Sequence, residues 1–135
     1  METVVEVARR ALGPVGVFLP FSMASAPSAD EQRQAARRLE DAGYRAAWTN
    51  EAVGGKDALV QLAVLLAATE RLVLGTSIAN IWARAPQTAH GAAALLAQAF
   101  PGRFVLGLGS ATRSRRPASA ASSAGRWPRC AATWT

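Results

Sequence analysis

Strand-like and helix-like patterns alternate along the first 110 residues, and this alternation limits the possible folds more than any other feature. Short, mostly apolar segments predict strands at 15–20, 44–51, 71–80 and 103–109. Helical periodicity predicts helices between them, over 28–43, 57–70 and 86–100. Successive strands begin roughly 30 residues apart, which is the length of a βαβ unit. The sequence therefore predicts an α/β protein with a parallel sheet, either an open doubly wound sheet or part of a (β/α)₈ barrel.

Residues at the expected boundaries support these elements. Ser28 and Glu31 have the spacing of a capping box, and Gly43 is a typical helix terminator. Pro86 suits the first turn of the third helix, where a missing N–H costs nothing. The wholly apolar segment 15–20 suggests a first strand that is buried on both faces. No G-x-G-x-x-G pattern follows it, so a classical dinucleotide-binding sheet is not expected.

The net charge of +6 is concentrated at the carboxyl end of the chain. Residues 1–109 carry ten basic and nine acidic side chains, whereas residues 110–135 carry five arginines and no acidic residue. No recognition motif accompanies this charge, so specific nucleic-acid binding is not expected, although a basic tail can bind polyanions through charge alone. The sequence also lacks an apolar run long enough for a membrane span.

Residues 111–135 are predicted to form a disordered tail. They are rich in Ala, Arg and Ser and show no apolar periodicity, so they cannot bury enough surface to offset the entropy of ordering. A change of reading frame near residues 110–113 is one hypothesis for this change in composition, and a naturally short protein with a flexible tail is the other. The predicted domains are therefore 1–110, a partial barrel, and 111–135.

Features near both ends of the chain bear on where the protein is located. A stretch resembling a signal peptide follows Arg9 and Arg10, but its apolar part is short and ends at Pro20. The single cysteine, Cys130, cannot form an internal disulfide. A cytoplasmic protein is therefore expected.

Candidate functional residues lie where the predicted strands end, because ligands bind at the carboxyl ends of strands in both architectures. Asn50 and Glu51 lie at the tip of the second strand. They could transfer protons or anchor a polar ligand, but equally they could be a solvated pair, with Glu51 capping the next helix. After the third strand, Trp82 and Arg84 could contact a flat ring and an anion, or could instead pack under the third helix and face solvent. His90 has no partner at metal-ligand spacing, so no metal site is expected.

Four segments together resemble the bacterial luciferase-like monooxygenase family over about residues 13–110. They are "VGVFLP", "LEDAGYRAAWTNE", "ATERLVLGTSIANIWARAPQTAH" and "FPGRFVLGLG". Members of this family are (β/α)₈ barrel enzymes that use FMN or the deazaflavin coenzyme F420, and the stretch "TNE…GGKDAL" is most similar to an F420-dependent branch. The resemblance implies the first four βα units of an incomplete TIM-type barrel.

The resemblance also implies a cofactor site. A bulge in the third strand would carry a cis peptide bond between Ser77 and Ile78 and would support the cofactor ring, with Asn80 at the ring edge. Gly107 and Gly109 at the tip of the fourth strand complete the expected cofactor-binding set, and Asn50 and Glu51 would lie near the reactive face, with Glu51 as a proton carrier. The implied activity is hydride transfer or monooxygenation on a small organic substrate, with F420 as cofactor and FMN as the alternative.

Two further readings of the sequence stay open. The chain could be a half-barrel remnant or an interaction module without enzyme activity. Four units leave the outer strands as apolar edges, which could pair with a second copy to form a homodimer.

Overall fold

A computed structural model describes residues 2–19, 27–52 and 55–110. Four parallel strands form the main sheet in the order β1-β2-β3-β5: β1 (Gly16–Phe18), β2 (Ala46–Thr49), β3 (Val73–Thr76) and β5 (Phe104–Val105). Beyond β3 and β5, the chain continues into a second, two-stranded parallel sheet made of β4 (Ala79–Asn80) and β6 (Leu108–Gly109). The predicted segment 15–110 therefore is α/β with parallel βα units.

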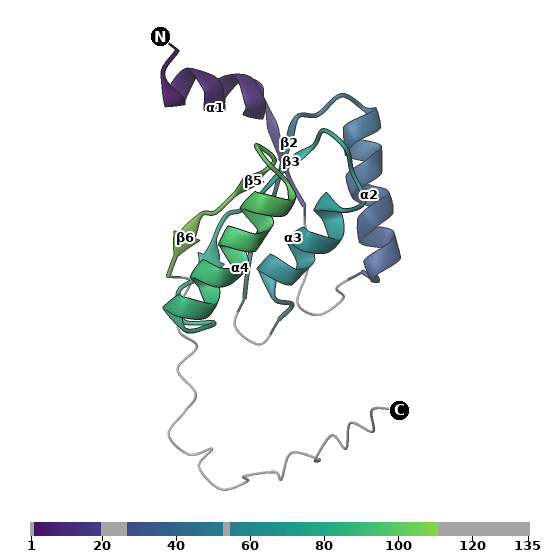
Figure 1. Ribbon diagram of the computed structural model, residues 1–135. Coiled ribbons are helices and arrows are strands. Elements are labelled where there is room, and N and C mark those ends of the chain that lie inside the picture. Colours follow the sequence, from purple (N-terminus) through teal and green to yellow (C-terminus); the bar gives the residue numbers. More distant parts are fainter. Residues whose placement is uncertain (1, 20–26, 53–54, 111–135) are drawn as a thin grey trace, which may run out of the picture.

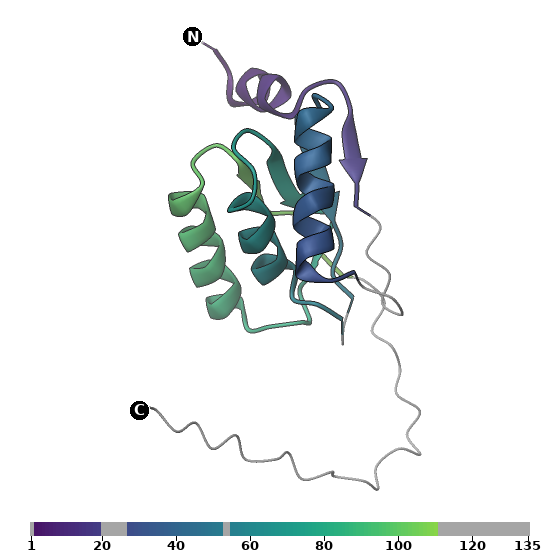
Figure 2. The same cartoon turned by 90° about the vertical axis from the view of Figure 1, so that its right-hand side faces the viewer.

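Three helices connect the strands, and they lie side by side on one face of the sheet (Figures 1 and 2). They are α2 (Ala29–Asp41), α3 (Ala58–Leu66) and α4 (Pro86–Ala99). A doubly wound sheet reverses its strand order and carries helices on both faces. Here the strands follow one another in chain order with helices on one side, which is the arrangement of a partial TIM-type barrel.

The hydrophobic core lies between the sheet and these helices, and α3 contributes most of it. Leu62, Leu65 and Leu66 of α3 are completely buried, and Leu74 of β3 packs into the same cluster. Apolar residues on nearly all sides of α3 explain this position, since only a helix in the middle of the layer is covered by neighbours on both flanks.

The boundary signals are confirmed at three places. Ser28 and Glu31 form the capping box at the start of α2, and Gly43 adopts a positive φ of 85° after that helix ends. Pro86 occupies the first turn of α4.

Two expectations about the strands are wrong. The first strand is not buried on both faces: β1 is an edge strand, and Phe18 is 47% exposed because β1 pairs only with β2 within the described residues. The fourth strand is not continuous, because β5 is separated from β6 at 106–107, whereas the third divides into β3 and β4 at Ser77 and Ile78, where the resemblance implied a bulge. The two strands stay paired beyond these breaks, since β4 and β6 form a parallel pair as β3 and β5 do.

The sequence patterns did not predict α1 (Val4–Leu12). Thr3 and Glu6 form a capping box at its start, but none of its residues is buried. It lies apart from the other helices, at the end of the sheet where the strands begin (Figure 1). The predicted disordered tail, 111–135, lies outside the described residues. Within the described part of the chain, no helix is long and apolar enough to cross a membrane.

Candidate functional site

The strand breaks bring the predicted site residues together at the carboxyl edge of the sheet. The backbone N–H of Ser77 donates to the carbonyl of Thr49 over 2.6 Å, and the N–H of Glu51 donates to the carbonyl of Ile78 over 3.0 Å. The Ser77–Ile78 peptide bond is cis, as the resemblance implies. The tip of β2 therefore lies directly against the bulge between β3 and β4.

Gly107 permits an unusually close approach on the other side of this bulge. A Cβ atom at this position would lie 2.3 Å from the carbonyl oxygen of Thr76, which no side chain can tolerate. The Thr76 hydroxyl donates to the Gly107 carbonyl (2.8 Å) and accepts from the Gly107 N–H (2.9 Å). Thr76 was not among the predicted site residues, although its place directly before the bulge was a usable signal.

Gly109 provides a second contact between the two strand tips. The Ile78 side chain packs against it, with Cγ1 3.1 Å from the place where a Cβ would lie. The N–H of Ala79 donates to the carbonyl of Gly107 over 2.7 Å, and that of Ile81 to the carbonyl of Gly109 over 2.9 Å. The predicted residues Ser77, Ile78, Gly107 and Gly109 therefore form one continuous surface.

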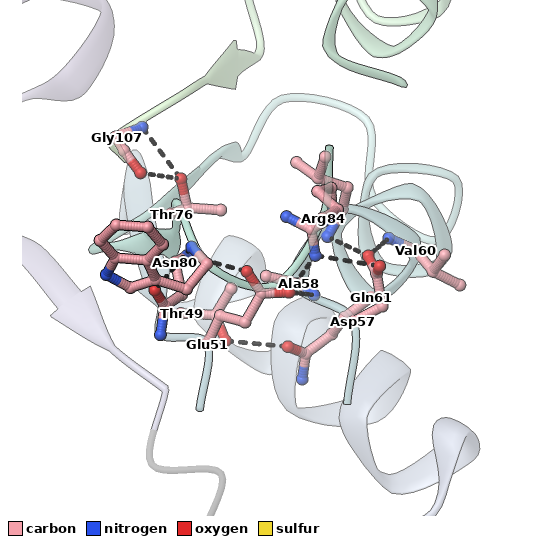
Figure 3. A network of polar contacts seen from close by, with 12 residues as sticks. Thr49, Glu51, Asp57, Ala58, Val60, Gln61, Thr76, Asn80, Arg84 and Gly107 are labelled. Carbon is pink, nitrogen blue, oxygen red and sulfur yellow. Dashed lines mark hydrogen bonds and ion pairs between the residues drawn. The ribbon is translucent and has the colours of Figure 1, made fainter. Parts of the chain in front are cut away.

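Glu51 is buried at the centre of a polar network (Figure 3). Its Oε2 atom accepts from the backbone N–H of Asn80 (2.8 Å), and its Oε1 atom accepts from that of Ala58 (3.1 Å) at the start of α3. Arg84 also donates to Oε1. Of the interpretations left open by the sequence, the structure shows the capping contact with the next helix.

Arg84 links Glu51 to Asp57, whose Oδ2 accepts from the guanidinium over 2.9 Å. Burial alone would lower the pKa of Arg84, but the two carboxylates outweigh it and raise that pKa. Burial likewise would raise the pKa of Asp57, but the N–H of Val60 and the Arg84 guanidinium lower it below its ordinary value. The Arg84 side chain is only 10% exposed, so the expectation that it faces solvent is wrong.

Asn80 is held in place by three backbone contacts. Its N–H donates to Glu51, its carbonyl accepts from the N–H of Ala83 (3.0 Å), and its side-chain Oδ1 accepts from the N–H of Trp82 (3.1 Å). The last contact fixes the orientation of the amide. A flipped amide would place its NH2 group against the N–H of Trp82, so that two donors would face each other. Its Nδ2 atom is then a buried donor without an acceptor, the only such side-chain atom within the described residues.

The remaining candidates lie at the margin of this network. Asn50 is exposed at the tip of β2, next to Glu51. Trp82 is 57% exposed, so it does not pack under the third helix. His90 is exposed on α4, where it lines a cavity of about 250 Å³ together with Asn80 and Arg84.

Sequence patterns also did not reveal a series of buried, hydrogen-bonded polar side chains between β2 and the helices. The Thr49 hydroxyl donates to Gln61 over 2.9 Å, and Gln61 donates to Gln32 over 2.7 Å. All three side chains are buried, and they connect β2 to α3 and α2. Polar residues at apolar helix positions were the available signal.

Sequence comparison with known proteins finds a partial relative of this chain. One relative, a Mycobacterium tuberculosis protein named "Putative coenzyme F420-dependent oxidoreductase", is 43% identical over 70 residues. That segment covers 52% of this chain and 20% of the relative, so the chain spans about a fifth of the length of the protein it matches.

A family comparison covers more of the chain. The sequence model of the luciferase-like monooxygenases matches residues 14–123, which is 110 of the 135 residues. The match includes every strand, the helices α2 to α4 and the whole carboxyl edge described above, and it extends past residue 110 beyond the described residues. The chain belongs to the luciferase-like monooxygenase family.

Proposed function

We propose that the carboxyl edge of this sheet binds the ring system of coenzyme F420, with FMN as the alternative, as part of an oxidoreductase that acts on a small organic substrate. The family includes flavin- and F420-dependent enzymes, and the name of the Mycobacterium tuberculosis relative specifies F420. Because the matched segment is short, the whole relative's activity is a proposal for this chain.

One observation carries the proposal: the buried, unpartnered Nδ2 donor of Asn80. A buried donor without an acceptor costs about 1–3 kcal/mol, so its retention needs a reason. An acceptor atom on the edge of a bound ring would supply the missing partner. Both F420 and FMN carry carbonyl oxygens and ring nitrogens that can accept such a bond.

The neighbouring surface also fits a flat ring. Gly107 and Gly109 present no side chains, and Ile78 offers a half-buried apolar side chain between the strand tips. Ser77 is exposed beside it. These residues would support the ring, and Asn80 would orient it.

The bound cofactor would supply hydride chemistry, and the chain's residues would position it and exclude water. Asn50, exposed at the tip of β2, is the described residue best placed to meet a substrate on the same edge. Glu51 as a proton carrier stays a prediction, and its contacts weigh against it, since both carboxylate oxygens already accept from buried donors.

Fluorescence titration of the 135-residue chain with F420 and with FMN tests the proposal. We expect saturable binding, weakened about fivefold to tenfold by Asn80→Leu, which is the loss of one hydrogen bond to the ligand. Thr49→Val is the matched control, because it removes a buried polar group that faces α3 and should lower stability without changing the dissociation constant. Equal affinities of Asn80→Leu and the wild type would contradict the assigned role of Asn80.

An inactive half-barrel that associates with a second copy is the second candidate. The observation that favours it is the apolar edge strand β1, where Val15 is 61% and Phe18 47% exposed. Light scattering distinguishes the two readings: a dimer that binds neither cofactor supports the second, and a Phe18→Lys variant should then be monomeric.

A further inference from the structure

Glu51 holds both ends of the short segment that follows the strand break. Its backbone N–H donates to the carbonyl of Ile78 over 3.0 Å, and its side-chain Oε2 accepts from the N–H of Asn80 over 2.8 Å. One residue of β2's tip therefore fixes the chain on either side of Ala79. The positions of the Ile78 side chain and of the Asn80 amide both depend on these two hydrogen bonds.

Arg84 makes this arrangement possible. The Glu51 side chain is 3% exposed and the Arg84 side chain 10%, so the carboxylate needs a buried countercharge. The same guanidinium binds Asp57, which caps α3 through the N–H groups of Leu59 and Val60 (2.9 and 3.0 Å). The pair thus ties the strand break to the start of a core helix, which is a rigid support.

These contacts engage both carboxylate oxygens of Glu51. The oxygens accept from two backbone N–H groups and a guanidinium, all of which only donate. The carboxylate is therefore suited to hold a fixed geometry.

We propose that Glu51 and Arg84 are positioning residues, which fix residues 78–80 so that Ile78 and the Asn80 amide meet the bound ring. This inference rests on the proposed function, because the ring is the ligand named there. It changes the assignment of Glu51 from the predicted proton carrier to a support for the ring-binding segment. It also assigns a role to Arg84, whose guanidinium donates to Glu51 and Asp57.

The test compares Glu51→Gln and Arg84→Met with a control arginine, Arg103→Met. Arg103 is also partly buried and donates to the carbonyls of Leu66 and Leu72, but at the opposite end of the sheet. All three variants should lower the urea midpoint. Only Glu51→Gln and Arg84→Met should weaken F420 or FMN binding, about fivefold to tenfold under conditions in which each variant is folded. If Arg84→Met does not fold, the isosteric Glu51→Gln decides.

Amide hydrogen exchange gives a readout that needs no cofactor. Exchange at the Asn80 N–H should accelerate at least tenfold in both variants, while exchange in the α3 core stays close to the wild-type rate. In Arg103→Met the Asn80 N–H should remain protected. Glu51 and Arg84 act as one pair, so the second substitution should remove nothing further. The double variant should therefore bind the cofactor no more weakly than the single variant with the lower affinity.

The possible results distinguish failure of the proposed function from failure of the positioning role. Wild-type protein that binds neither cofactor overturns the proposed function, and the ring-positioning role falls with it. Wild-type binding together with unchanged affinity in both variants overturns the positioning role alone. Asn80 exchange that is unchanged, or that rises only with exchange throughout the protein, also overturns it.

Discussion

Replacing Gly107 by Ala tests the close approach on which the carboxyl edge depends. The new Cβ atom would lie 2.3 Å from the Thr76 carbonyl oxygen, and 3.4 Å from the carbon of the same group. The obstructing atom belongs to the backbone, so it cannot rotate away as a long side chain could. Either β5 and β6 must move away from β3, or the Thr76 peptide must turn.

The expected loss of stability follows from what such a movement breaks. Overpacking in a well-packed region costs about 1–3 kcal/mol. The Thr76 hydroxyl also makes two hydrogen bonds to Gly107, and each contributes about 0.5–1.5 kcal/mol. Some relaxation will preserve part of these bonds, so a total loss of about 2–5 kcal/mol is expected.

Urea unfolding followed by circular dichroism measures this loss, and Gly91→Ala is the matched control. Gly91 lies within α4, and no atom is within 4 Å of its would-be Cβ, so the same substitution there should stabilise the protein by about 0.5–1 kcal/mol. An unfolding midpoint for Gly107→Ala equal to that of the wild type would refute the close approach.

Three further predictions concern the core, the caps and the charges. Leu62→Ala, at a fully buried position of α3, should cost about 2–5 kcal/mol in the same urea assay. Ser28→Ala should cost about 1 kcal/mol and lower the melting temperature, because it removes the cap of α2. Burial alone would raise the pKa of Glu40, but the N–H groups of Arg71, Glu70 and Leu72 lower it. A carboxylate with a lowered folded-state pKa stabilises the fold above its unfolded value of about 4.3, and this contribution should disappear in urea melts as the pH falls below that value.

Patterns that act within one segment were readable from the sequence. The capping residue Ser28, the terminator Gly43 and the first-turn Pro86 each act on their own helix, and each lies where the sequence places it. The alternation of strands and helices left the strand order open between a doubly wound sheet and a partial barrel, and the family resemblance implied the order that is observed. The family resemblance supplied the cis bond at Ser77–Ile78, which no local pattern indicates.

Pairing between distant residues could not be read in the same way. Glu51 and Arg84 are 33 residues apart, and each on its own looks like an exposed charge on a loop. Their contact depends on how far the tips of two strands extend beyond the sheet, which is a property of the assembled fold. The break in β3 was implied by the family resemblance alone, since "RLVLGTSIAN" has the composition of one continuous strand.

The two ends of the sheet differ in how completely their polar groups are hydrogen-bonded. At the amino end, Glu40 accepts from three backbone N–H groups and Arg103 donates to two carbonyls, so the buried polar groups there are paired. At the carboxyl end Glu51 and Arg84 make comparable contacts, yet the Asn80 amide beside them keeps an unpaired donor. Glu51 is buried whereas Glu40 is only partly buried, and the unpaired donor lies beside Glu51. A fold that satisfies its other buried side-chain donors within the described residues, and leaves one unpaired where the strands end, has the feature expected of a binding edge.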